Sequence, residues 1–236
     1  MPAEAKPFIK NFNVQEVEGA FAPLPCLLYS RQLSDDDALY VVVNGTLHGS
    51  SLIGCEAATL TTLKAIELLH PDLVINSGTC GAFREKGAAI GRVYISNAVM
   101  FHDRRVMGDD EWSTQSFGNY PIYSRAAEIA DALGMPMGKV TTGSSLDLQP
   151  CDLDVINENG GELKDMEGAA VAFVCSLFNV PCLLIKSVTD LLDGPADTLE
   201  EFRQNLSRAS QQLSDANIRV VNYLCHASRE VKELKS

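Results

Sequence analysis

Pro71-Asp-Leu-Val-Ile-Asn-Ser-Gly-Thr-Cys-Gly-Ala82 is the stretch of this sequence that says most about its fold. Its apolar first half is typical of a buried strand, and its second half is a glycine-containing turn. Such a turn brings backbone N–H groups and the Thr79 hydroxyl to the carboxyl end of the strand, where ligands bind in open α/β sheets. Gly78 and Gly81 also suit a tight bend without a ligand, so both interpretations stay open. No Gly-Lys-Ser/Thr follows, which argues against a nucleoside triphosphate site.

Short runs rich in valine, isoleucine and leucine alternate with segments of helical periodicity along the chain. This alternation predicts an α/β fold whose central mixed β-sheet is covered by helices. The expected strands are Leu39–Val43, Leu73–Asn76, Val93–Val99, Lys139–Thr142 and Cys182–Val188. The expected helices are Ser51–Leu69, Arg125–Leu133 with Ser124 as its N-cap, Leu163–Phe178, and a long C-terminal helix opened by a capping box at Thr198–Glu201.

The composition predicts a single domain over residues 1–236. Hydrophobic residues make up 46% of the 236 residues and charged residues 21%, which is enough apolar material for one large core. A formal net charge of -12 disfavours nucleic acids and anionic membranes as partners. The sequence has neither an apolar leader nor a run of about 18 apolar residues, so we expect a cytoplasmic protein.

The cysteines give no sign of a disulfide framework or a metal site. The seven are odd in number and widely spaced, and none forms a Cys-x-x-Cys pair. Most have apolar neighbours, which favours small buried side chains in a reducing compartment. We therefore expect neither a metal ion nor a cofactor.

Two further segments place acidic residues at the ends of apolar elements. Val180–Asp190 is typical of an apolar strand that ends in a Thr-Asp pair. Asp190 there fits a ligand site, and it fits an ordinary turn or N-cap aspartate equally well. The apolar helix expected over Leu163–Phe178 opens with Asp165 and Glu167. The helix dipole would explain acidic residues in a first turn without any ligand.

Together these segments resemble a known family. Asp165-Met-Glu-Gly-Ala-Ala170 followed by Lys186-Ser-Val-Thr-Asp190 resembles the methylthioadenosine nucleosidases, above all those of plant type, within the nucleoside phosphorylase superfamily. Asn76-Ser-Gly-Thr-Cys-Gly81 is similar to the ribose-side loop of that family, and the resemblance runs from Met1 to about Tyr223. It implies a nucleoside phosphorylase-like fold and hydrolysis of 5'-methylthioadenosine to adenine and 5-methylthioribose. S-adenosylhomocysteine is the second candidate substrate.

The resemblance also implies a role for each matched residue. Asp190 matches the acid that protonates adenine at N7, and Glu4 matches the glutamate that deprotonates the attacking water. Glu167 and the backbone of Met166 match the contacts to the ribose hydroxyls. Two carboxylates on opposite sides of one N-glycosidic bond suit an inverting hydrolase. The other residues expected in the substrate site are Thr79, Cys80, Gly81, Leu146, Asp147, Asp165 and Thr189.

Two other functions stay open as alternatives. Purine nucleoside phosphorylases of this superfamily hold phosphate with arginines in two loops, where this chain has Pro2-Ala-Glu-Ala5 and Asn76. Water is therefore favoured over phosphate as the nucleophile. A non-catalytic storage or purine-binding relative is disfavoured because Glu4, Glu167 and Asp190 are all present. Family members begin with an apolar first strand that is missing from this chain, which leaves Glu4 close to a terminus.

A homodimer is the last implication of the resemblance. In the family, an aromatic residue and a histidine-bearing loop of one subunit close the 5' pocket of the other, and Phe117 and His102 are the matching positions here. Val99–Tyr120 mixes aromatic and charged residues, as an interface core with a polar rim does. Each aromatic residue would fit equally well inside its own subunit. We expect Val106–Pro121 to cover the 5' end of the substrate.

Overall fold

A barrel of five strands forms the centre of the molecule, seen in a computed structural model that describes residues 1–105 and 111–233. The strand order around it is β10-β6-β9-β8-β7. Neighbouring strands run parallel except for the β6–β9 and β7–β10 pairs, so the sheet is mixed. The α/β class and the central mixed sheet are therefore confirmed. The strands are β6 (Val74–Ala82), β7 (Val93–Phe101), β8 (Met137–Thr142), β9 (Leu163–Asp165) and β10 (Cys182–Leu191).

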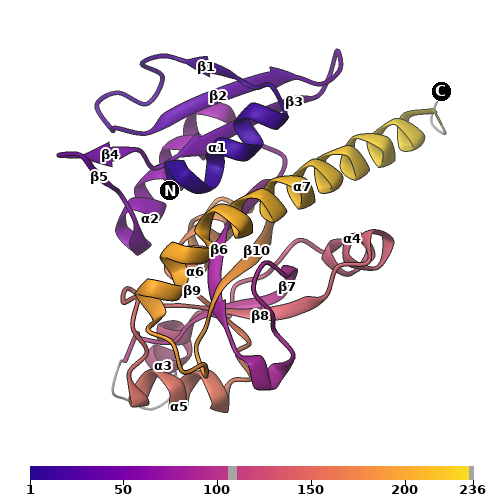
Figure 1. The fold of residues 1–236 in the computed structure, drawn as a ribbon. Coiled ribbons are helices and arrows are strands. Elements are labelled where there is room, and N and C mark those ends of the chain that lie inside the picture. The colour runs from indigo at the N-terminus through magenta and orange to yellow at the C-terminus, as the bar shows by residue number, and fades with distance from the viewer. Residues whose placement is uncertain (106–110, 234–236) are drawn as a thin grey trace.

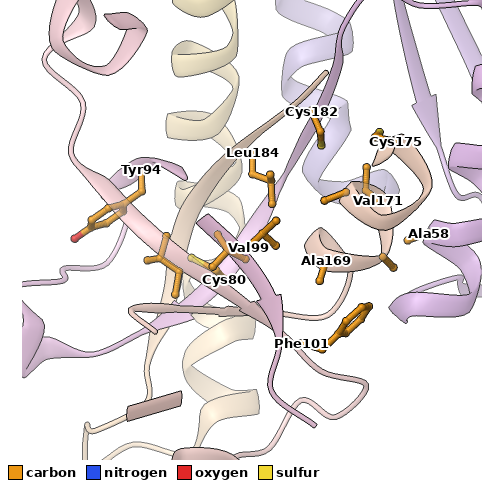
Figure 2. Packing of buried hydrophobic residues seen from close by; sticks show 14 of the residues in the cluster. Ala58, Cys80, Tyr94, Val99, Phe101, Ala169, Val171, Cys175, Cys182 and Leu184 are labelled. Carbon is orange, nitrogen blue, oxygen red and sulfur yellow. The ribbon is translucent and has the colours of Figure 1, made fainter. Parts of the chain in front are cut away.

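Helices cover two sides of the barrel, and one of them, the long α7, crosses the whole molecule (Figure 1). On one side, Ala58 of α2 and Val171 of α6 join Leu184 of β10 in the main hydrophobic cluster (Figure 2). On the other side, α4 and α7 pack on Ile185 of the same strand. Every residue of β10 is buried because both of its faces are covered. These helices are α2 (Gly54–Leu69), α4 (Ala126–Leu133), α6 (Gly168–Leu177) and α7 (Thr198–Glu233).

A second, smaller layer brings the start of the chain to the barrel. Phe8 of α1 and Phe12, directly after this helix, stack at 5.2 Å between ring centroids and pack with Val221 of α7. An antiparallel sheet of β1, β2 and β3 lies alongside (Figure 1). None of the described helices is both long and apolar enough to cross a membrane. The remaining elements are α1 (Pro2–Asn11), β1 (Gln15–Val17), β2 (Leu27–Gln32), β3 (Ala38–Val43), β4 (Thr46–Leu47), β5 (Ser50–Ser51), η1 (Arg84–Lys86), α3 (Glu111–Phe117) and α5 (Pro150–Glu158).

Several local expectations were wrong. The glycine-containing turn expected after Asn76 is a strand, because β6 continues to Ala82 in its pairing with β10. Leu163–Asp165 is not helical: it forms β9, because it pairs with β6 and β8, and α6 begins only at Gly168. The N-cap of α4 is Arg125 in place of Ser124. The residue that caps α7 is Asp197 in place of Thr198, since Asp197 accepts the Glu200 backbone N–H at 3.0 Å. The carboxylate of Glu201 points away from its own helix to the end of β10.

Candidate active site

The site lies where β6 and β10 end side by side. These strands are parallel, and their register sets Ser187 against Thr79 and Asp190 against Gly81, with an irregularity between Val188 and Asp190. The two segments that sequence analysis singled out are therefore neighbours in space. Parallel strands deliver their carboxyl ends to one edge, and this is why the polar residues of both meet there.

Asp190 is buried directly against the backbone of Gly81. A Cβ on residue 81 would lie 2.6 Å from Oδ2 of Asp190, so only glycine fits at that position. The other oxygen, Oδ1, accepts a hydrogen bond of 2.7 Å from the Thr189 hydroxyl. Burial raises the pKa of Asp190 and outweighs the opposing effects of Thr189 and Lys164. A carboxyl group whose pKa is raised in this way is better suited to act as a general acid.

Glu4 reaches the same strand edge from α1. Its Oε1 accepts two hydrogen bonds from Thr79, at 2.8 Å from the backbone N–H and 2.7 Å from the hydroxyl. Its Oε2 pairs with the terminal ammonium of Met1. Burial raises the pKa of Glu4, but the Met1 ammonium and the Thr79 donors outweigh burial and hold it below the ordinary value. Glu4 is therefore an ionised carboxylate, as a general base must be.

Glu4 thus contacts Thr79, and Asp190 contacts Gly81, on the same strand. The Cα atoms of residues 79 and 81 are roughly 7 Å apart at the usual rise of a strand. The pKa of Asp190 is raised and that of Glu4 is lowered. Two carboxyl groups whose environments push their pKa values in opposite directions form the pattern of an acid and a base.

A buried ion pair lies beneath the site. Lys186 Nζ is 2.6 Å from Asp165 Oδ2, and the two side chains are 1% and 0% exposed. Asp165 also accepts hydrogen bonds from the Thr142 hydroxyl at 2.5 Å and from the backbone N–H of Gly168 at 2.9 Å. Asp165 was expected to bind substrate, but its carboxylate is fully engaged with protein donors and closed to solvent. The structure therefore gives it a supporting position under the site.

Glu167 and Met166 connect the strand β9 to the helix α6. Glu167 Oε1 accepts a 2.8 Å hydrogen bond from the backbone N–H of Gly54, and the Met166 carbonyl accepts one of 3.4 Å from the Cys55 thiol. Burial, together with the charge of Asp165, raises the pKa of Glu167. Both residues remain half-buried, so a ligand can reach them.

A buried lysine holds the loop that was expected to contact adenine. Lys164 Nζ donates to the carbonyls of Ser145 and Leu146 at 2.6 and 3.0 Å. The side chains of Leu146 and Asp147 are exposed on this loop. Burial lowers the pKa of Lys164, against the raising effect of several carboxylates that include Asp190. Lys164 therefore binds the loop through hydrogen bonds and interacts with Asp190 through its charge.

His102 lies under the same loop, inside its own subunit. Its side chain is 1% exposed, and a Cβ on Gly143 would lie only 2.3 Å from its Nε2. Burial lowers the pKa of His102, and the charge of Lys164 lowers it further. This position differs from the surface loop that we expected to reach a partner subunit. Phe117, at the end of α3, is half-buried, while residues 106–110 of the expected 5' segment lie outside the described residues.

The remaining expected residues contribute mainly through their backbones. The Cys80 thiol faces the main hydrophobic cluster (Figure 2), and its carbonyl accepts a 3.2 Å hydrogen bond from Thr189. All seven cysteines are free. Sequence analysis missed Lys164 and Lys186 as parts of the site. A lone lysine inside the apolar run Leu183–Val188 was the available signal, since a buried lysine requires a partner.

Two surface hollows lie away from this site. One, of about 310 Å³, is lined by residues 121–124, 175, 176 and 179–182. The other, of about 340 Å³, lies between the end of α4 and the middle of α7. Apart from Pro121, the last residue of the expected 5' segment, neither is lined by a residue that the sequence predicted to be functional. The candidate active site is therefore identified by the polar side chains that meet at the ends of β6 and β10, and not by a surface hollow.

Comparison with known proteins agrees with this geometry. A family model described as the phosphorylase superfamily matches residues 1–222. The 5'-methylthioadenosine nucleosidase of Arabidopsis thaliana is 38% identical over 95% of this chain and 84% of its own length. The chain belongs to the methylthioadenosine nucleosidase family. The resemblance inferred from sequence motifs is thereby confirmed.

Members of this family also share the fold. The solved apo structure of the A. thaliana 5'-methylthioadenosine nucleosidase superposes with a TM-score of 0.90 at 37% identity, over 94% of this chain and 92% of that one. A 5'-methylthioadenosine/S-adenosylhomocysteine nucleosidase of A. thaliana is 35% identical over 95% of this chain and 89% of its own length. The futalosine hydrolase of Helicobacter pylori, at 20% identity and a TM-score of 0.77, shares the fold alone.

Proposed function

We propose that this protein is a nucleosidase that hydrolyses 5'-methylthioadenosine to adenine and 5-methylthioribose. The observation that carries the proposal is the pair of carboxyl groups at the β6 edge, where Asp190 lies against Gly81 with a raised pKa and Glu4 lies against Thr79 with a lowered pKa. The names of the two A. thaliana relatives describe the same activity.

Asp190 supplies the proton for the leaving base. Its Oδ1 lies 2.7 Å from the Thr189 hydroxyl, and its Oδ2 faces Gly81. Transfer of this proton to N7 lets adenine leave as a neutral molecule. A positioned general acid contributes about 10² to 10⁴-fold to such a step.

The sugar and the water occupy the other side of the bond. Glu167 and the backbone of Met166 hold the ribose hydroxyls, and the negative charge of Glu167 stabilises the oxocarbenium-like transition state. Glu4 takes a proton from the attacking water. The two hydrogen bonds from Thr79 fix Oε1 of Glu4 and so hold the carboxylate in place at the strand edge.

The donors around Glu4 favour water over phosphate. A bound phosphate would need the N–H and O–H groups of Thr79, and both donate to the Glu4 carboxylate. The nearby ammonium of Lys186 is paired with Asp165. A phosphate dianion would therefore meet an uncompensated negative charge.

We further propose that the enzyme is a cytoplasmic homodimer that acts in methionine salvage, with S-adenosylhomocysteine as the second candidate substrate. Large apolar side chains are exposed on α2 and at the end of α6, two helices that pack against each other. Exposed apolar residues that gather on adjoining elements mark an interaction surface. They are Ile53 (49% exposed), Leu60 (52%), Leu177 (63%) and Phe178 (42%).

An assay in phosphate-free buffer tests the reaction. Purified protein is expected to release one adenine for each 5-methylthioribose from 5'-methylthioadenosine, at a rate that added phosphate leaves unchanged. Formation of a sugar 1-phosphate, with turnover that requires phosphate, would establish the phosphorylase alternative instead. The same assay on S-adenosylhomocysteine ranks the two substrates by kcat/KM.

A further inference from the structure

The first turns of α7 bracket the strand end that carries Asp190. Glu201 Oε2 accepts a 2.7 Å hydrogen bond from the backbone N–H of Leu191. Asn205 Nδ2 donates to the carbonyl of Thr189 at 3.0 Å. The residues before and after Asp190 are therefore both tied to one helix. Asn205 Nδ2 also donates to the Glu201 carbonyl at 2.9 Å, which joins the two arms of the bracket.

The bracket lies at the irregular point of β10. Val188 pairs with Cys80 and Asp190 with Gly81, so Thr189 is the extra residue of a bulge. A bulge turns side chains to new directions and leaves backbone groups without ladder partners. The Thr189 carbonyl obtains its partner from Asn205. Side chains of α7 thus supply hydrogen-bond partners for the backbone on both sides of Asp190, at the point where the strand pairing is irregular.

Capping of its own helix does not explain the position of the Glu201 side chain. The start of α7 is capped by Asp197, and Glu200, the neighbouring acid, accepts a 3.0 Å hydrogen bond from Gln204 on the exposed face. The charged groups that face Asp190 are Lys164 from β9 and Glu201 from α7. The negative charge of Glu201 raises the pKa of Asp190, whereas Lys164 lowers it.

From this geometry we infer that Glu201 and Asn205 are positioning residues that aim the carboxyl group of Asp190 at the departing base. Glu201 supplies a hydrogen-bond acceptor for the strand end and a negative charge beside the acid. Asn205 holds the preceding carbonyl. The inference rests on the proposed function, because it presupposes that Asp190 is the proton donor.

Three variants of the protein separate these contributions. Glu201→Gln keeps an acceptor for the Leu191 N–H but removes the charge, Glu201→Ala removes both, and Glu200→Gln is the matched control on the exposed face of the same turn. The readouts are kcat, KM, the melting temperature and the pH dependence of kcat on 5'-methylthioadenosine.

Glu201→Gln is expected to keep kcat within about 2-fold of wild type at low pH, where Asp190 is protonated. Loss of the negative charge lowers the pKa of Asp190, so activity should disappear at a lower pH than in wild type as the pH rises. Glu201→Ala should lower kcat about 10-fold or more while KM changes less than about 3-fold. Glu200→Gln should match wild type in every readout.

An unshifted pH profile in Glu201→Gln, or a wild-type kcat in Glu201→Ala, would overturn the inference. If Glu201→Ala does not fold, Asn205→Ala replaces it, with the same expected fall in kcat and the same contrary result. Asp190→Asn is assayed in parallel to separate the two claims. If Asp190→Asn keeps near-normal turnover, Asp190 is not the acid of the proposed function. If Asp190→Asn is inactive while Glu201→Ala has a normal kcat, only the positioning role is refuted.

Discussion

At the scale of single residues, the site shifts the pKa values of two carboxyl groups in opposite directions. Asp190 lies against Gly81 with one hydroxyl donor, while Glu4 faces both donors of Thr79 and a terminal ammonium. Burial raises the pKa of both carboxyl groups, and for Glu4 the charge of the Met1 ammonium, together with the hydrogen bonds from that ammonium and from Thr79, outweighs it. The difference in pKa is therefore set by partners and not by depth.

Replacing Asp190 by asparagine tests the acid directly. Asp190→Asn keeps the shape of the side chain and its contact with Thr189 but carries no transferable proton. We expect kcat to fall about 10² to 10⁴-fold while KM stays near the wild-type value. Steady-state kinetics with 5'-methylthioadenosine measures both constants.

The matched control is Asp193→Asn. Asp193 lies three positions further along, where it accepts hydrogen bonds of 2.8 and 2.9 Å from the backbone N–H groups of Arg84 and Glu85. It is exposed, and both of these hydrogen bonds lead to residues outside the site. If both variants lost activity equally, the effect would be structural and Asp190 would lose its assigned role.

Sequence analysis located these carboxyl groups but not what surrounds them. Asp190 and Glu4 were found through a resemblance, because spacing alone left Asp190 open to a turn interpretation and Glu4 open to a surface one. Lys186, Glu201 and Asn205 were not found. Their partners lie 21, 10 and 16 residues away in the chain, and no local pattern encodes a contact that exists only after β10 has paired with β6.

At the scale of elements, the Lys186–Asp165 pair joins three pieces of structure. Lys186 belongs to β10 and Asp165 to β9, and Asp165 also holds the first N–H of α6 through Gly168. Sequence analysis placed the start of α6 too early because a strand of three residues has no measurable period. β9 is defined by its neighbours β6 and β8, which are remote in sequence.

Asp165→Asn is therefore expected to destabilise the protein strongly. It leaves the buried ammonium of Lys186 without its counter-ion, which typically costs about 3 to 5 kcal/mol of unfolding free energy. Urea unfolding followed by circular dichroism measures the change. The double variant Asp165→Leu with Lys186→Met removes both charges and should recover much of the loss.

An exposed pair provides the control for this prediction. Arg125 and Glu128 form an ion pair of 2.6 Å on the surface of α4. Glu128→Gln should leave the urea midpoint almost unchanged, since solvent screens exposed pairs. Equal destabilisation by Asp165→Asn and Glu128→Gln would contradict the argument from burial.

At the scale of the whole molecule, the proposed dimer gives a further test. Leu60→Glu places a charge in the exposed apolar surface of α2 and should convert the protein to a monomer of lower specific activity. Leu199→Glu, a comparably exposed leucine at the start of α7, should remain dimeric. Light scattering with an activity assay at each concentration distinguishes them, and a fully active wild-type monomer would refute the dimer.

The closed barrel has a consequence for how the protein is made. The strand β10 fills the gap between β6 and β7, but it is the last strand to leave the ribosome, and its partner residues in β6 come about a hundred positions earlier. Until Cys182–Leu191 has emerged, β6 and β7 each present an open edge to the crowded cell. A nascent chain that stalls before Cys182 should therefore aggregate or be held by chaperones, whereas one in which Leu191 has emerged from the ribosome can already close its barrel.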